Sequence, residues 1–158
     1  MDLLRSLPKD ATMLDLFKAH AEREIISAFT SGLNSCTYCH RSHSFVAEEL
    51  GVGEAVVPAL LDDIDSAPID ARLRPILRYV RKLTLTPSRL VEADAAAVYD
   101  AGWDNEALFH AIAIAAYFNF CNRITAGAGL DVPDTTLRDA AKQLAEKGYK
   151  ISYGGLKP

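Results

Sequence analysis

Hydrophobic residues recur along the chain at intervals of three and four residues, which is the spacing of one face of an α-helix. The pattern is clearest between residues 12 and 30, where the apolar positions are Leu14, Phe17, Ala21, Ile25, Ala28 and Phe29. No segment alternates apolar and polar residues over the length of a strand. We therefore predict an all-α protein of six or seven helices.

Turn and capping residues divide the rest of the pattern into further helices. We expect these at residues 36–50, 54–64, 71–85, 87–101, 105–126 and 134–147. Gly51 suits the position after a helix end, and Asp104 is placed to cap the helix that follows it. Pro75 lies inside its segment, so we expect either a kink or a later start. The segment 105–126 is nearly all apolar and is expected to be a central, buried helix.

Composition adds limits to this picture. The chain has 158 residues, of which 49% are hydrophobic and 24% charged, as in one soluble globular domain. The net charge of −4 argues against nucleic acid or an anionic membrane as a partner. The first residues contain no recognisable secretory signal, and the longest apolar run is too short to span a bilayer. We therefore expect a cytoplasmic protein with neither kind of partner.

The stretch CTYCHRSH, residues 36–43, holds the candidate chemistry. If Cys36 opens a helix, both thiols lie in the first turn, where free N–H groups and the helix dipole stabilise a thiolate. At about 100° per residue, Cys36, Cys39 and His43 fall within roughly 60° of one another around the axis. His43 is then placed to take or return a thiol proton, whereas His40 points away and is expected to be exposed. Glu24, on the preceding helix, is a candidate to orient His43.

Four interpretations of this stretch compete. The Cys-x-x-Cys-His spacing fits c-type haem attachment, but no export signal is visible and no methionine follows the motif to serve as second axial ligand. A zinc site built from Cys36, Cys39, His43 and Glu24 is conceivable, although Cys121 sits alone in an apolar helix. Inert packing of the two cysteines stays open as well. The spacing favours a redox-active dithiol.

The pattern of a glutamate, eleven residues, Cys-x-x-Cys, three residues and a histidine resembles the alkylhydroperoxidase D (AhpD)-like group of the carboxymuconolactone decarboxylase superfamily. Glu24, Cys36, Cys39 and His43 fit that pattern. The later stretch AYFNFCNRIT, residues 116–125, is similar to the Asn-Arg signature of the peroxidase-related branch. The resemblance covers residues 12–130 of a single domain, 1–158, whose last helix and tail occupy 131–158.

This resemblance implies an AhpD-like helical domain, usually assembled as a homo-oligomer, with the activity of a cysteine-dependent peroxidase. It makes Cys39 the peroxidatic sulfur and Cys36 the resolving one, with a Cys36–Cys39 disulfide between them. Glu24 and His43 would relay protons. The substrate would be a small hydroperoxide and the reductant an external dithiol, in some members a lipoyl-bearing protein; no cofactor or metal is implied. The alternative is a non-enzymatic redox sensor or partner-binding module, and after it a structural metal site.

Several positions depart from the pattern or lie outside it. Better-known alkylhydroperoxidases have a histidine between the cysteines, where this chain has Tyr38, a poor proton shuttle at neutral pH. Cys121 is expected to be a small buried hydrophobe, and His110 a hydrogen-bonded core or interface histidine. The polar residues of the same apolar helix are expected to have a structural or subunit-contact role: Asn119, Asn122 and Arg123.

Overall fold

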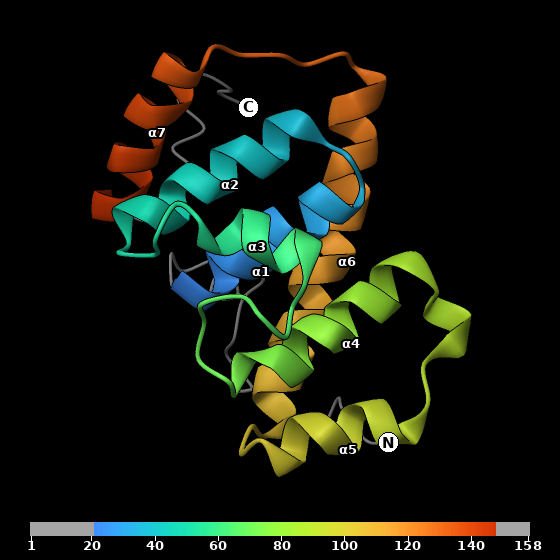
Figure 1. Cartoon of the computed structure of the whole chain (residues 1–158). Helices are drawn as coiled ribbons and strands as arrows, with labels where there is room; N and C mark the ends of the chain where they lie inside the picture. Colours follow the sequence, from blue (N-terminus) through green and yellow to red (C-terminus); the bar gives the residue numbers. More distant parts are fainter. Residues whose placement is uncertain (1–20, 148–158) are drawn as a thin grey trace, which may run out of the picture.

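A computed structural model describes residues 21–147 of the chain, and every regular element in that part is helical (Figure 1). The elements are α1 (Ala21–Leu33), α2 (Thr37–Glu49), α3 (Val56–Asp62), α4 (Leu73–Leu85), the 3-10 turn η2 (Pro87–Arg89), α5 (Glu92–Asp100), α6 (Asn105–Gly127) and α7 (Asp134–Lys147). The prediction of an all-α protein is confirmed. Residues 12–20 of the first predicted helix and the tail after Lys147 lie outside the described residues.

The helix α1 lies at the centre of the packing. It contacts α2, α3, α4 and α6, and every residue from Glu24 to Ser31 is buried. A helix that is buried all round must be largely apolar, as Ile25, Ile26 and Phe29 are here. The polar members of this buried run therefore need partners inside the protein, and one of them, Glu24, belongs to the candidate site.

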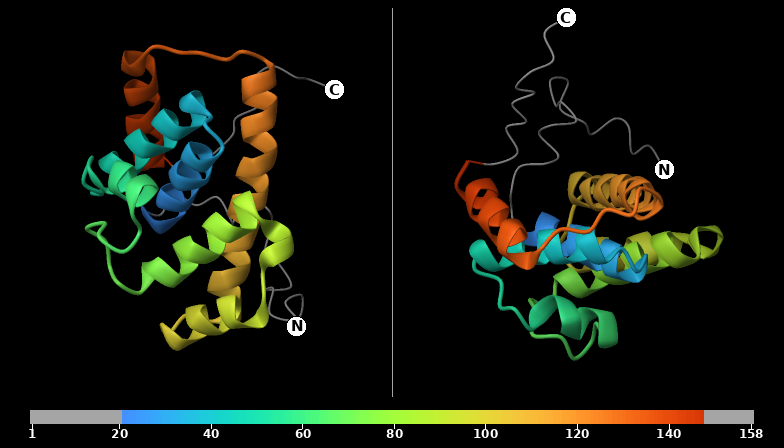
Figure 2. Two further views of the ribbon diagram at one scale, coloured as in Figure 1. Left: turned by 45° about the vertical axis from the view of Figure 1, so that its right-hand side comes forward. Right: turned by 90° about the horizontal axis from the view of Figure 1, so that it is seen from above.

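The long helix α6 runs along one side of α1, with α4 and α5 near its N-terminal end (Figures 1 and 2). At the other end, α2 lies between α6 and α7. A separate apolar cluster joins α2 to α7; its buried members are Phe45, Val46, Leu137 and Ala141. No helix in residues 21–147 is long and apolar enough to cross a membrane.

Two glycines occupy positions where a larger residue would be strained or crowded. Gly51 follows α2 with a φ of +93°, which a side chain would strain. Gly32 lies where α1, α2 and α3 meet closely, because a Cβ atom there would come within 2.6 Å of the Leu61 side chain. A side chain at this position would also come within 3.1 Å of the His40 ring on α2, so Gly32 suits the close packing of the three helices.

The starts of two helices agree with the sequence. Asp104 accepts a hydrogen bond from the Ala107 N–H at 2.8 Å and caps α6 as predicted. The helix α4 begins at Leu73, so Pro75 lies in its first turn, where its missing N–H costs no helical hydrogen bond. Of the two outcomes expected at Pro75, the later start is the one observed.

Two expectations about helices are wrong. Residues 87–101 do not form one helix: η2 ends at Arg89 and α5 begins at Glu92, because the Asp94 carboxylate accepts the Val91 N–H at 2.8 Å and starts a new helix there. The helix α6 is not buried all round, since Phe120 is 64% and Ile124 60% exposed. It buries only the face that meets α1 and α4.

Candidate functional site: a dithiol between three helices

Both cysteines of the motif lie at the N-terminal end of α2. Cys36 is the residue that precedes the helix, and Cys39 lies in its first turn. The two thiols are 4% and 5% exposed, and neither is in a disulfide. The prediction that Cys36 opens a helix is therefore confirmed. Free backbone N–H groups at this end of α2 favour negative charge, which is the condition that a reactive thiolate needs.

Glu24 and His43 form a hydrogen-bonded pair beside the dithiol. The Glu24 Oε2 and His43 Nδ1 atoms lie 2.7 Å apart, and Glu24 is only 2% exposed. The His43 ring also packs edge-on against Phe118 of α6, with 4.5 Å between ring centres. The carboxylate fixes the ring orientation and favours the tautomer that carries hydrogen on Nδ1. The structure thus brings together the glutamate and the histidine of the predicted pattern.

The helix α6 provides a polar partner for each sulfur. The Cys39 Sγ and Thr125 Oγ1 atoms lie 3.5 Å apart, which is a hydrogen bond to sulfur. The Asn122 side chain interacts with Cys36. Asn122 and Thr125 are three residues apart on α6, and Cys36 and Cys39 are three residues apart at the start of α2. Each sulfur therefore meets a different polar group. Thr125 was not predicted as a site residue.

A buried amide network holds this part of α6 against the loop between α1 and α2. The Asn34 Nδ2 atom donates to Asn122 Oδ1 at 2.9 Å and to Asn119 Oδ1 at 3.2 Å. Asn122, which is 2% exposed, donates in turn to Ser31 Oγ at 3.0 Å, and Arg123 donates to Asn119 Oδ1 at 3.1 Å. These bonds fix the segment that carries Cys36. Asn122 therefore both anchors the loop and lines the site.

Burial raises the pKa of the Cys36 thiol above its ordinary value, and the neighbouring Cys39 adds to this effect. The Cys39 backbone N–H and the Asn122 side chain act in the opposite direction, since both favour a Cys36 thiolate. Burial prevails, so Cys36 is a protonated thiol at neutral pH.

Two side chains in the motif occupy places that the sequence did not indicate. His40 is not exposed as predicted: its Nδ1 lies 3.0 Å from the Ala28 carbonyl oxygen, because the ring packs over Gly32 and ties α2 to α1. Tyr38 packs against the apolar cluster between α2 and α7. The residue between the cysteines therefore contributes to the packing of α7.

The other candidates lie at the edge of the site or away from it. Cys121 is partly buried, and burial raises the pKa of its thiol. His110 lies with its Nδ1 3.5 Å from Arg23 Nη2, and burial lowers the pKa of its imidazole. In residues 21–147, no three His, Cys, Asp or Glu side chains are grouped so that they could hold a metal ion. The zinc interpretation thus finds no ligand set in this part of the chain.

Comparisons with known proteins bear on this geometry. No protein-family model matches the chain, and no curated protein sequence matches it. Solved structures do. One is an alkylhydroperoxidase AhpD core, an uncharacterized peroxidase-related protein from Ralstonia eutropha JMP134; it is 25% identical, with a TM-score of 0.69 over 89% of this chain and 70% of that one. Another, from Silicibacter sp. TM1040, is also an uncharacterized peroxidase-related protein, at 25% identity and TM-score 0.67 over 87% of this chain and 67% of that one.

The chain matches the AhpD-like, peroxidase-related proteins. The AhpD-like fold predicted from the pattern of Glu24, Cys36, Cys39 and His43 is thereby confirmed. The names of the two neighbours suggest an oxidoreductase. They describe no substrate or mechanism, so the chemistry of this chain has to be argued from its own residues.

Proposed function

We propose that the protein is a cysteine-dependent thiol peroxidase that reduces hydroperoxides through a Cys36–Cys39 disulfide. The observation that supports the proposal is the 2.7 Å Glu24–His43 pair, because it orients a histidine that follows Cys39 by four residues, about one turn of α2. A peroxidase of this kind needs an attacking thiolate, a proton donor for the leaving oxygen and a second thiol within reach. The proposal assigns these roles to Cys39, His43 and Cys36, which lie in the first two turns of α2 and at the residue before it.

The first half-reaction consumes the peroxide. His43 takes the proton of Cys39, and the thiolate attacks the terminal oxygen of the hydroperoxide. The O–O bond breaks, Cys39 becomes a sulfenic acid, and the departing alkoxide takes the proton back from His43 as an alcohol. Glu24 supports both transfers because it holds the Nδ1–H of the ring and stabilises the imidazolium between them.

The second half-reaction forms the disulfide. The Cys36 thiol attacks the Cys39 sulfur, the S–OH bond breaks, and hydroxide leaves with the Cys36 proton as water. An external dithiol then reduces the disulfide and returns two thiols. Burial raises the pKa of the Cys36 thiol, which fits its assignment as the second sulfur to react. A lipoyl-type dithiol, a cytoplasmic location and assembly as a homo-oligomer are part of the same proposal.

Thr125 and Asn122 have complementary roles in this scheme. In the reduced protein the Cys39 thiol donates to Thr125 Oγ1; once Cys39 is ionised, the hydroxyl can rotate and donate to the thiolate. Asn122 stabilises Cys36 when it leaves as a thiolate during reduction of the disulfide. The two α6 residues therefore each serve one ionised sulfur, at different points of the cycle.

Thiol counting and turnover test this proposal together. One equivalent of an organic hydroperoxide should remove two free thiols from the wild-type protein and from Cys121→Ser. With an excess of an external dithiol as reductant, both proteins should consume peroxide catalytically. Cys39→Ser should consume no peroxide. Peroxide consumption by Cys39→Ser at the wild-type rate would contradict the proposal. Reversible loss of two thiols without turnover under any dithiol would instead support the redox-sensor alternative.

A further inference from the structure

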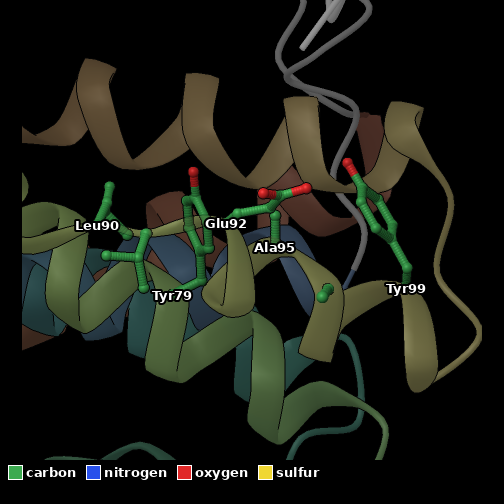
Figure 3. Close-up of a pocket in the computed structure, with 7 residues that line it drawn as sticks. Tyr79, Leu90, Glu92, Ala95 and Tyr99 are labelled. Atoms are coloured by element: carbon green, nitrogen blue, oxygen red, sulfur yellow. The ribbon is translucent and has the colours of Figure 1, made fainter.

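A cavity lies away from the cysteines, between α4, α5 and the two residues that precede α5 (Figure 3). Its volume is about 570 Å³, within the range of pockets that hold small organic molecules. It is lined by Tyr79 of α4, by Leu90 and Val91 before α5, and by Glu92, Ala95, Ala96 and Tyr99 of α5. The redox site uses α1, α2 and the C-terminal part of α6, so none of its residues takes part in this lining.

The wall of this cavity combines apolar surface with three oxygen-bearing side chains. Leu90 and Val91 form one side, and Val91 is 58% exposed although it is apolar. The hydroxyls of Tyr79 and Tyr99 and the carboxylate of Glu92 point to the same side of the cavity (Figure 3). Burial raises the pKa of the Tyr79 hydroxyl, which stays neutral in the physiological range and can give or accept a hydrogen bond.

Charge decides what kind of molecule suits the cavity. Glu92 is the only charged residue in the described lining. Lys82, which lies three residues after Tyr79 on α4, is already bound to both carboxylate oxygens of Asp94, at 2.7 and 2.9 Å. The Asp94 carboxylate also accepts the Val91 N–H, so a side chain of the protein itself already caps the start of α5. The described lining of the cavity therefore carries net negative charge, which disfavours an anionic ligand.

We propose that this cavity binds a small organic cation, namely an apolar or aromatic body that carries a protonated amine. The ammonium group would lie between Glu92 and the tyrosines, since a carboxylate and the faces of tyrosine rings both attract cations. The body would cover the side chains of Leu90 and Val91 and fill the space beside the short side chains of Ala95 and Ala96.

Three probes of the same size test the proposal, because they differ in charge at one end only. Each is titrated into the isotope-labelled full chain while backbone NMR shifts are followed: 2-phenylethylammonium, the neutral 2-phenylethanol and the anionic phenylacetate. The amine should bind most tightly and the acid most weakly, with shifts confined to residues 90–99 and Tyr79. Equal affinities of the three probes, or no saturable shifts in this region, would overturn the proposal.

Variants assign the charge effect to one carboxylate. Glu92→Gln should weaken amine binding about threefold to fivefold, as expected for a partly solvated ion pair, and should leave the alcohol unaffected. Glu54→Gln removes the same charge from an exposed turn outside the cavity and should change neither affinity. Added salt should weaken amine binding to the wild type more than to Glu92→Gln. Equal salt dependence in both proteins would show that Glu92 does not hold the cation.

Peroxide turnover is a separate readout in the same proteins. Glu92→Gln and Tyr99→Ala should keep wild-type turnover, because neither residue lies at the dithiol, while Tyr99→Ala should weaken amine binding through the lost ring. Cavity variants that lose amine binding but keep turnover would show that the two sites are independent. Cys39→Ser, which should bind the amine without turning over peroxide, provides the complementary result.

Discussion

The face of α2 that meets α1 and α6 differs in chemistry from the face that meets α7. The first face presents Cys39 to the partly buried Thr125 and His43 to the buried Glu24, each at a defined distance. The second presents Tyr38, Arg41 and Phe45 to an apolar cluster and to exposed carboxylates, including Asp131 and Asp134. One helix therefore has a chemical face and an anchoring face.

Burial explains the difference between the two faces. A buried polar group has to keep its particular partner, because its loss leaves an unsatisfied atom without water. Apolar contacts and exposed ion pairs are less selective: the exposed Asp131 contributes little, while Phe45 and Leu137 stabilise α7 through buried area. Substitutions on the chemical face should thus change reactivity, and those on the anchoring face should change stability.

The largest expected effect is on the chemical face, at His43. In His43→Asn the amide nitrogen can replace Nδ1 in the bond to Glu24, but no ring nitrogen remains to transfer a proton. We expect kcat/KM for hydroperoxide to fall at least about 100-fold, the usual range for loss of general acid–base catalysis. Steady-state assays with excess dithiol measure it. The control on the other face, Glu48→Gln, breaks the exposed pair with Arg138 and should stay within about twofold of wild type. A His43→Asn protein that retained a third of the wild-type rate would remove the proton relay from the account.

On the anchoring face, a substitution should lower the stability of the protein and leave its turnover nearly unchanged. Leu137 of α7 is 4% exposed and belongs to the apolar cluster that joins α7 to Phe45 and Val46 of α2. Leu137→Ala should lower the free energy of unfolding by about 2–4 kcal/mol, as is usual for such truncations. Urea unfolding measures the loss, and peroxide turnover per folded molecule should change by less than about twofold. A tenfold fall in that turnover would mean that the two faces are not separate.

The smallest of the three effects concerns Thr125, where hydroxyl and shape can be separated. Thr125→Val keeps the shape of the side chain and removes the partner of Cys39. Loss of one hydrogen bond should slow alkylation of Cys39 by iodoacetamide at neutral pH about twofold to tenfold. The matched control, Thr125→Ser, keeps the hydroxyl and should react at close to the wild-type rate. Equal rates in the valine and serine variants would show that the hydroxyl does not support the thiolate.

The sequence predicted those features that depend on local spacing. Periodicity placed α2, α6 and α7, and Asp104 and Gly51 marked ends that the structure confirms, because caps and turns act within a few residues. The same local geometry put Cys39 and His43 about one turn apart on α2, with Cys36 at the residue before the helix. The choice of Glu24 as partner of His43 needed the family pattern, since the bond joins residues on two helices.

Features that depend on tertiary packing escaped prediction. Thr125 reaches Cys39 only because the amide network of Asn34 and Asn122 holds α6 against the α1–α2 loop. His40 is partly buried because its ring reaches the Ala28 carbonyl oxygen on α1, and no spacing rule contains that contact. A weak signal did exist for Thr125: it lies three residues after Asn122, on the one polar face of an otherwise apolar helix.

The most direct test of the central claim is to identify which sulfur the peroxide oxidises first. Cys36→Ser and Cys39→Ser are each treated with one equivalent of hydroperoxide in the presence of dimedone, which traps sulfenic acids, and the adduct is located by mass spectrometry. The account predicts a dimedone adduct on Cys39 in Cys36→Ser and none on Cys36 in Cys39→Ser. An adduct on Cys36 that forms as fast as the adduct on Cys39 would contradict it.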